Sequence, residues 1–533
     1  MQRQGVMMPG RIPWALVALI CTAMLGRVWA QHWQVPEEGL QSINAAKVLN
    51  YAGYFAADRM RGRDTPSAEL DSCAAFIAHK LRAAGWVVEM QPFNLLRVRL
   101  GEPNCFVLAV DGKNVVYRLR KDYSPAHVSH SAEVQGGVAF VGYGITAPEY
   151  GYDDYASIDV RGKIVLLFAH EPQEHDSSSV FDGARETVHS SVLQKVENAR
   201  LHGAVGVLLV TDPLHHRFER PAHEWLPDSQ GAPLVLEERE PIPLVVMRVG
   251  KRLAEDLASP GGKTLSQLQA AIDSTLVPQS FLVPQVEVRM RATLVYTRYA
   301  TQNLIGVWEG VDPLLRHETV VVGAHYDHIG ARGDTLIFPG ADDNASGTAA
   351  LLAIAEALAS AGGRPKRTVV CVAFAGEEKG LFGSRYYVAN PRFPLSTTVA
   401  MLNMDMIGCN DTAGVKIEGC AHAPELQAVV ERANAFEGLA LHFSEKKVPA
   451  GSDAMPFHWR GVRAVNFTTG LHADYHKPTD TVDKLTGEHL AQVARLVFAV
   501  TWLLANEELP PRAEKDFGLR GDEATGHAPG QKP

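Results

Sequence analysis

The sequence predicts an α/β protein, because helix and strand patterns alternate over its C-terminal half. The central strand is an apolar run without charge at residues 369–375, which is typical of a strand buried on both faces of a parallel sheet. Glu377 and Glu378 follow this strand directly. Open α/β sheets bind ligands at the carboxyl ends of their strands, and buried carboxylates lower stability unless a proton or a metal compensates them. The pair therefore favours a functional site, with an ordinary acidic helix start as the alternative.

The length and charge of the chain limit the classes of protein to consider. It has 533 residues, more than a single hydrophobic core usually holds, so we expect two or more domains. A hydrophobic content of 46% describes a globular protein. The formal net charge of -9 argues against a nucleic-acid partner.

The N-terminus has the pattern of a secretory signal peptide at residues 1–30. Arg3 and Arg11 precede a short apolar run, and Ala30 stands directly before the expected cleavage point. A retained membrane anchor is the alternative, but the run is shorter than the ~20 residues that a spanning helix needs. We therefore expect an exported protein, periplasmic or extracellular, with no membrane contact after cleavage. Export permits disulfides, and Cys409 and Cys420 are the closest pair, although sequence does not define the pairing.

The first half of the chain is predicted to contain two regions of different structure. Helical patterns at residues 43–85 surround a turn at residues 61–66, and a strand follows at 86–92. From residue 128 to 290 glycines are frequent and strands are expected at 163–168 and 203–210, with a helix at 193–201 between them. This block is predicted to be an inserted β-rich domain.

Three histidines in this block are of a residue type that binds metals. They are His215, His216 and His223. No second histidine completes an HExxH helix, and neighbouring prolines disfavour a helix there. We expect ordinary surface loop histidines at these positions.

From residue 303 the pattern becomes regular α/β. The expected elements are a strand at 320–322 that ends at His325, a helix at 346–360, the central strand, a helix through Tyr387, a strand at 399–404 that ends at Asp405, a strand at 464–468 and a last helix at 488–505. Residues 507–533 are rich in charge, Pro and Gly and are predicted to be a disordered tail.

Metal-ligating residue types recur at the ends of these strands. They are His325 and Asp327 in GAHYDH, Asp342 and Asp343 in GADDNASG, Glu377 and Glu378, Asp405, and His476 in DYHKPTD. Each motif alone is weak, but successive βα units place them at one sheet edge. Imidazoles and carboxylates without cysteine suit zinc, manganese or cobalt. The set is too large for one four-coordinate zinc, so two metals about 3.5 to 4 Å apart, bridged by a carboxylate, use it better.

Competing catalytic machinery has no support in the sequence. We find no GxSxG elbow, HExxH helix or P-loop, and no dinucleotide fingerprint in a βαβ setting. Serine nucleophile and nucleotide chemistry are therefore not expected.

At these residues the sequence resembles the co-catalytic zinc exopeptidases, the family of bacterial secreted leucyl aminopeptidases and glutamate carboxypeptidase. The motifs GAHYDH, GADDNASG, AGEEKGLFGS, NMDMIG, GSD and DYHKPTD stand in family order. The resemblance implies an α/β fold with a mixed, largely parallel sheet sandwiched by helices, formed by residues 31–127 and 291–506. It also implies that residues 128–290 are an inserted protease-associated domain, which offers a surface for contact with another protein.

The resemblance assigns metal ligands for two Zn²⁺ per chain. His325 and Glu378 would be terminal ligands of different metals, with Asp405 completing the first site and His476 the second. Asp343 is similar to the bridging carboxylate, because it stands four residues before Gly347, and Asp342 is the alternative.

Three further roles follow from the resemblance. Glu377 is similar to the general base of the family. Adjacent glutamates on extended backbone point in different directions, so Glu377 and Glu378 can take different roles. Asp327 resembles the carboxylate that orients the His325 imidazole, with a turn cap as the alternative. Tyr475 is similar to a tyrosine that stabilises an oxyanion, with simple packing as the alternative.

The expected function is an exported zinc aminopeptidase that hydrolyses N-terminal residues from peptides through a metal-bridging hydroxide. Alternatives on the same fold are a carboxypeptidase or a glutaminyl cyclase with one zinc. A non-catalytic binding protein is the alternative from another class.

Overall fold

The computed structural model describes residues 35–176, 178–181, 183, 187–216, 234–237, 242–409, 414–445, 449 and 451–507. The expected signal peptide and, apart from Glu507, the expected tail lie outside the described residues. Among the helices that are described, none has the length and apolar character needed to cross a membrane.

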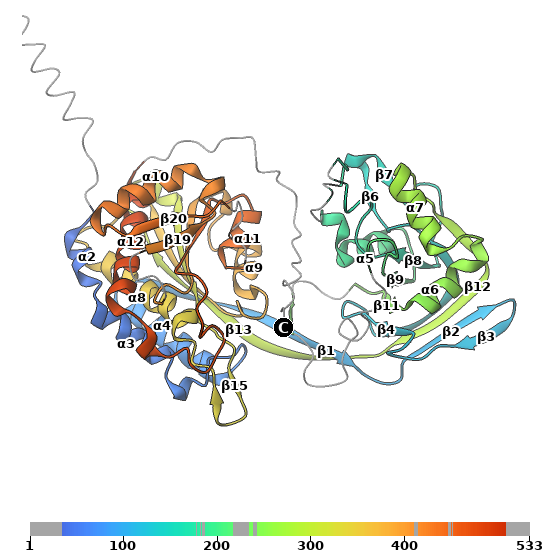
Figure 1. The fold of residues 1–533 in the computed structure, drawn as a ribbon, viewed down its shortest axis with the longest axis horizontal. Helices are drawn as coiled ribbons and strands as arrows, with labels where there is room; N and C mark the ends of the chain where they lie inside the picture. Colours follow the sequence, from blue (N-terminus) through green and yellow to red (C-terminus); the bar gives the residue numbers. More distant parts are fainter. Residues whose placement is uncertain are drawn as a thin grey trace, which may run out of the picture.

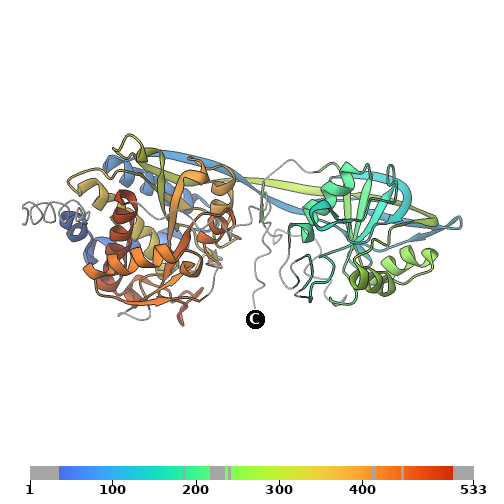
Figure 2. The same cartoon turned by 90° about the horizontal axis from the view of Figure 1, so that it is seen from above.

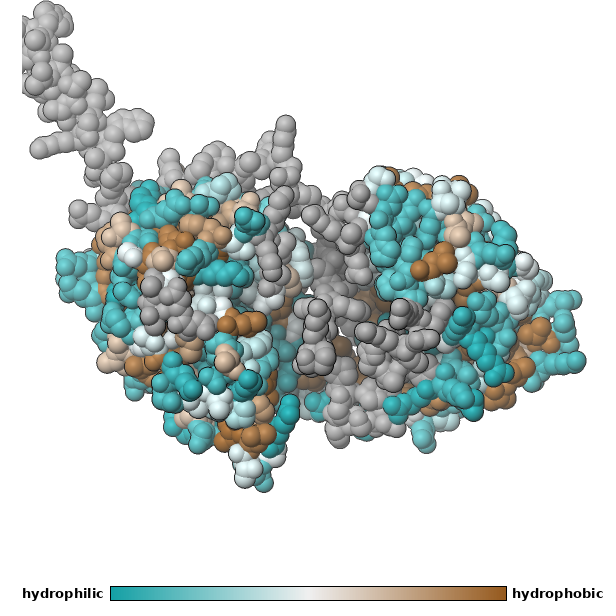
Figure 3. Space-filling view, in the orientation of Figure 1, coloured by the Kyte–Doolittle hydropathy of each residue, from teal (hydrophilic) through white to brown (hydrophobic). Residues whose placement is uncertain are grey.

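Two lobes are joined by a long antiparallel pair of strands (Figures 1 and 2). β1 (Val87–Leu100) and β13 (Leu294–Trp308) pair from Val87 with Val307 to Leu100 with Leu294. On the face drawn in Figure 3, the described hydrophobic residues form small separate patches on both lobes.

The first lobe contains a nine-stranded mixed sheet in the order β10-β1-β13-β17-β14-β18-β21-β19-β20. Its remaining strands are β10 (Leu234–Leu236), β14 (Thr319–His325), β17 (Thr368–Phe374), β18 (Thr398–Met404), β19 (Gly414–Glu418), β20 (Ala440–Phe443) and β21 (Ala464–Thr468). The four central strands, β17-β14-β18-β21, run parallel. The mixed α/β prediction is confirmed, although β1, β10 and β13 add an antiparallel flank.

Helices cover both faces of this sheet (Figure 1). One face packs on α3 (Ala45–Phe55), α4 (Ala68–Ala83), α8 (Gly347–Ser360) and α12 (Gly487–Asn506). The other face, with Val370 and Val372 of β17, packs on α9 (Phe382–Ala389) and α11 (Ala454–Trp459). Alternate residues of each central strand therefore enter different cores. These cores hold the carboxyl ends of the parallel strands in place.

The second lobe is built on an eight-stranded sheet in the order β3-β2-β12-β5-β8-β9-β11-β4. Its strands are β2 (Cys105–Val110), β3 (Lys113–Val116), β4 (Tyr123–Pro125), β5 (Ala132–Phe140), β8 (Ile164–Phe168), β9 (Gly206–Val210), β11 (Val245–Val249) and β12 (Phe281–Ala292), with helices α5 (Val192–Leu201), α6 (Lys251–Ala258) and α7 (Leu265–Thr275). The sheet starts with β2, so the expected boundary at residue 128 was placed too late. The reason is that β2 pairs with β12, and these strands close the lobe from both ends of the insertion.

The described cysteines are free thiols. They are Cys73, Cys105, Cys371, Cys409 and Cys420. Cys409 and Cys420, the closest pair in the sequence, are both buried and are not bonded to each other.

Candidate metal centre

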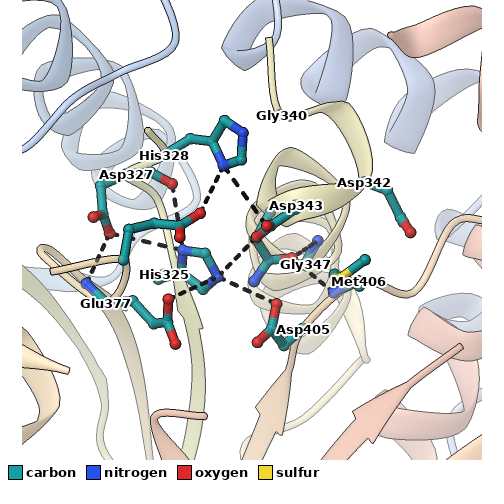
Figure 4. Close-up of polar contacts among 12 residues, drawn as sticks. His325, Asp327, His328, Gly340, Asp342, Asp343, Gly347, Glu377, Asp405 and Met406 are labelled. Atoms are coloured by element: carbon teal, nitrogen blue, oxygen red, sulfur yellow. Dashed lines mark hydrogen bonds and ion pairs between the residues drawn. The ribbon is translucent and has the colours of Figure 1, made fainter. Parts of the chain in front are cut away.

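The polar motifs meet at one edge of the nine-stranded sheet (Figure 4). His325 is the last residue of β14, Glu377 and Glu378 follow β17, and Asp405 follows β18. These three strands are parallel neighbours, so their carboxyl ends lie side by side. The structure brings together all five expected metal ligands at this edge.

Asp343 lies between two groups of candidate ligands. Its Oδ1 atom is 3.4 Å from Nε2 of His325, which is itself 3.2 Å from Oδ1 of Asp405. Its Oδ2 atom is 3.1 Å from Nε2 of His476, which is 3.0 Å from Oε2 of Glu378. The two oxygens of one carboxylate therefore face two different groups, as a bridging ligand requires.

Asp342 faces a different part of the structure. Its Oδ1 atom accepts a hydrogen bond of 2.7 Å from the backbone N–H of Gly408, and its Oδ2 atom lies 3.3 Å from Nε2 of His472. Figure 4 shows its carboxylate pointing away from His325, whereas that of Asp343 points towards the centre. The geometry therefore favours Asp343 over Asp342 as the shared carboxylate.

His328 belongs to the centre and was missed in the sequence analysis. It is fully buried, and its Nδ1 atom lies 2.7 Å from Oε1 of Glu378 and 3.8 Å from Oδ2 of Asp343. The available signal was its place as the last residue of GAHYDH, three positions after His325. Its direction depends on the loop after β14, which no strand periodicity describes.

Glu377 and Glu378 face different partners. Oε2 of Glu377 lies 3.9 Å from Nε2 of His325. Burial, opposed by His325 and reinforced by Glu378 and Asp405, holds the pKa of Glu377 well above its usual value. Burial also acts to raise the pKa of Glu378, but the close approach of His328 and His476 to its two oxygens holds that pKa well below the usual value. Glu377 is therefore the better proton acceptor of the pair.

Asp327 lies on the Nδ1 side of the His325 imidazole. Its Oδ1 atom is 3.7 Å from that nitrogen, and its backbone carbonyl lies 3.3 Å away. The same carboxylate accepts hydrogen bonds from the backbone N–H of Glu377 and from Oγ1 of Thr65, at 3.2 and 3.0 Å. Asp327 thus links the loop after β14 to the loop after β17.

Tyr475 packs against the candidate ligand His476. Its ring stacks on that of His476 with centroids 3.9 Å apart, and the residue is 36% exposed. Burial and the nearby carboxylates raise the pKa of Tyr475, so its hydroxyl remains a hydrogen-bond donor at neutral pH.

A buried arginine holds the surrounding loops. Arg63 is fully buried, and its guanidinium donates hydrogen bonds to the backbone carbonyls of Tyr326, Phe55, Pro339 and Gly340, at 3.0, 2.8, 2.6 and 3.0 Å. The loop after β14 and the loop before Asp343 are thereby tied to one side chain. This role was not visible in the sequence, because its partners are backbone atoms distant along the chain.

The chemistry of the donors fits a pair of zinc ions. Among the described residues, the site offers imidazole nitrogens and carboxylate oxygens without cysteine, a set that zinc accepts. Burial and then the charge of Glu378 raise the pKa of Asp343 to about 6. Without a cation, the negative charges of these neighbouring carboxylates therefore repel each other. Nε2 of His476 is buried, lies close to two carboxylates and makes a well-formed hydrogen bond to neither. Cations shared between these groups would compensate the charge and engage that nitrogen.

The part of the chain that carries this centre matches a known protein family. Residues 303–501 match the description Peptidase family M28. The chain belongs to this family, and the resemblance to the zinc exopeptidases is confirmed.

Two curated relatives are aminopeptidases by name. Aminopeptidase YwaD of Bacillus subtilis (strain 168) is 28% identical over 229 residues, which cover 41% of this chain and 48% of that protein. A probable leucine aminopeptidase of Arthroderma otae (strain ATCC MYA-4605 / CBS 113480) is 33% identical over 194 residues, which cover 35% of this chain and 54% of that protein. The chain thus spans about half the length of these relatives.

A solved structure shares the fold. It is an aminopeptidase from Aneurinibacillus sp. strain AM-1, with a TM-score of 0.50 and 20% sequence identity, and the likeness covers 90% of this chain and 99% of that one.

Proposed function

We propose that the protein is a di-zinc aminopeptidase that removes N-terminal residues from peptides. The observation that carries the proposal is Asp343, whose two oxygens face two ligand groups, with Glu377 beside them. Relatives in the same family that are named aminopeptidases support the substrate class. A zinc pair supplies Lewis-acid activation of water and of the substrate carbonyl.

The residues of the chain would divide the remaining work. The carboxylate of Glu377 takes a proton from the attacking water and returns it to the leaving amine. The hydroxyl of Tyr475 donates a hydrogen bond to the oxyanion that develops on the scissile carbonyl. Asp327 holds the His325 imidazole in the orientation that directs its Nε2 atom towards Asp343 and Asp405.

Export and the identity of the second lobe are part of the proposal. Residues 1–30 would direct export to the periplasm or the medium. The lobe inserted between β1 and β13 would be a protease-associated domain that contacts a protein or restricts access to the centre.

Metal content and substrate choice test the proposal together. The protein is purified without added metal, and its zinc content is measured alongside hydrolysis of leucyl amide and N-blocked leucyl amide. We expect zinc at the Asp343 centre and hydrolysis of the free amine alone. Cleavage of a blocked substrate at its C-terminal residue would indicate a carboxypeptidase. A single zinc at this centre with cyclisation of N-terminal glutamine would indicate a cyclase.

A further inference from the structure

A second cluster of histidines and carboxylates lies in the other lobe. β8 and β9 are parallel neighbours, with Phe168 opposite Val210. His170 stands two residues after the end of β8, and Asp212 stands two residues after the end of β9. Glu174 and His216 each follow four residues later. The two loops therefore deliver an imidazole and a carboxylate each to the same edge of the eight-stranded sheet.

The four side chains converge on a small volume. Oδ1 of Asp212 lies 2.6 Å from Nδ1 of His170 and 3.0 Å from Nδ1 of His216. Oε2 of Glu174 lies 3.5 Å from the same nitrogen of His216. The rings of His170 and His216 are stacked, with centroids 3.8 Å apart and an interplanar angle of 24°. One candidate ligand atom from each of the four residues lies within 4.8 Å of the others.

Hydrogen bonding inside the cluster does not account for Glu174. Asp212 is fully buried and is met by both imidazoles. The Oε2 atom of Glu174 is also buried, lies near His216 and has no hydrogen-bond partner among the residues that the structure describes. The nearby buried amine of Lys195 donates to the carbonyl of Tyr143. A cation among the four ligand atoms would compensate Glu174 and Asp212 together.

A neighbouring residue orients the central carboxylate. Gln269 of α7 is fully buried, and its Nε2 atom donates a hydrogen bond of 3.1 Å to Oδ2 of Asp212. Its Oε1 atom accepts a hydrogen bond of 2.8 Å from the backbone N–H of Leu214, in the loop that carries His216. Partners of this kind fix the direction of metal-binding carboxylates, and here they leave Oδ1 facing the two imidazoles.

We propose that His170, Glu174, Asp212 and His216 bind one Zn²⁺ in the second lobe, separate from the Asp343 centre. Two imidazole nitrogens and two carboxylate oxygens make a four-coordinate set that zinc accepts. Four protein ligands leave no open position, so this ion is structural and ties the loops after β8 and β9 together. The sequence predicts an ordinary surface loop histidine at position 216, whereas this proposal makes His216 a metal ligand. His223 lies outside the described residues.

Zinc counting on the full chain tests this site. Protein stripped with a chelator is reloaded with zinc and desalted, and zinc per chain is measured by inductively coupled plasma mass spectrometry. We expect the His170→Ala/His216→Ala double variant to hold one zinc fewer than the wild type. His202→Ala is the control in the same lobe, because its ring stacks on Tyr155 away from the cluster, and we expect it to match the wild type. An equal count in the double variant and the wild type would overturn the proposal.

A second arm separates this site from the Asp343 centre. In the Asp343→Ala variant, we expect one zinc to remain and added zinc to raise the thermal midpoint. Both effects should disappear when His170→Ala and His216→Ala are added to that variant. If the Asp343→Ala variant retains no zinc, the second site is overturned. If the wild type holds a single zinc and the His170→Ala/His216→Ala variant loses it, the di-zinc proposal is overturned and the second site stands.

Discussion

The Nδ1 atom of His328 lies 2.7 Å from Oε1 of Glu378. The other oxygen of this carboxylate, Oε2, lies 3.0 Å from Nε2 of His476. One carboxylate oxygen of Glu378 thus contacts the buried His328, while the other faces the ligand group that includes Asp343. This contact explains how an acidic residue just after a strand is directed at a metal centre instead of starting a helix.

His328 is expected to control metal affinity at the Glu378 side. His328→Ala should weaken binding of one zinc by ~10- to 100-fold, the usual effect of removing a partner that orients a ligand. His328→Gln, which keeps a donor, should restore part of the affinity. Zinc competition with a chelator measures both. His79→Ala, at an exposed position of α4, is the control, and equal affinities for His328→Ala and the wild type would exclude this role.

The neighbouring aspartates provide a matched pair of variants. Asp343→Asn should lower the zinc content of the centre, because a bridging carboxylate serves both ions. Asp342→Asn should retain the wild-type zinc content, since its side chain faces Gly408 and His472. Zinc per chain after gel filtration measures the difference. The opposite result would make Asp342 the bridge.

Glu377→Gln should separate chemistry from metal binding. We expect zinc content to be unchanged and kcat to fall by ~10²- to 10⁴-fold, because general base catalysis is lost while the ligand groups remain. Steady-state hydrolysis of leucyl amide measures kcat, with Glu431→Gln, at an exposed position of α10 (Pro424–Ala433), as the control. Turnover near that of the wild type would remove Glu377 as the base.

Arg63 is predicted to be a stability determinant of the first lobe. Arg63→Met leaves several buried carbonyls without their donor, which should lower the free energy of unfolding by at least about 3 kcal/mol. The exposed Arg332→Met should change it by less than about 0.5 kcal/mol. Urea unfolding followed by tryptophan fluorescence measures both. Similar losses in the two variants would contradict the role of the buried network.

His458 should make the first lobe sensitive to acid. Burial, and then His422, lower the pKa of His458 from 6.5 to about 4 in the folded chain. Between these values the unfolded chain binds a proton that the folded chain does not, so this contribution to stability is present above pH 6.5 and is lost as pH falls towards 4. The thermal midpoint of His458→Asn should therefore fall less than that of the wild type between pH 7 and pH 5. Parallel pH profiles would show that His458 does not titrate in this way.

Much of the first lobe followed from the sequence alone. Hydrophobic periodicity located the helices and strands that became α3, α4, α8, α12, β14, β17, β18 and β21, because each buries its apolar face in a continuous core. Parallel strands bring their carboxyl ends to one edge, so residues as distant as His325 and Asp405 were correctly expected to meet.

Tertiary structure decided the features that depend on loop direction and on distant partners. Asp342 and Asp343 are adjacent in the sequence, and only the folded loop turns one to Gly408 and the other to the ligand groups. His328 is directed at Glu378 by a loop that Arg63 ties to other backbone segments. The cluster of His170 and Asp212 joins loops 42 residues apart, which become neighbours because β8 and β9 pair. Local sequence patterns carry strand and helix preferences, whereas the direction of a loop side chain is determined by packing and hydrogen bonds from other parts of the chain.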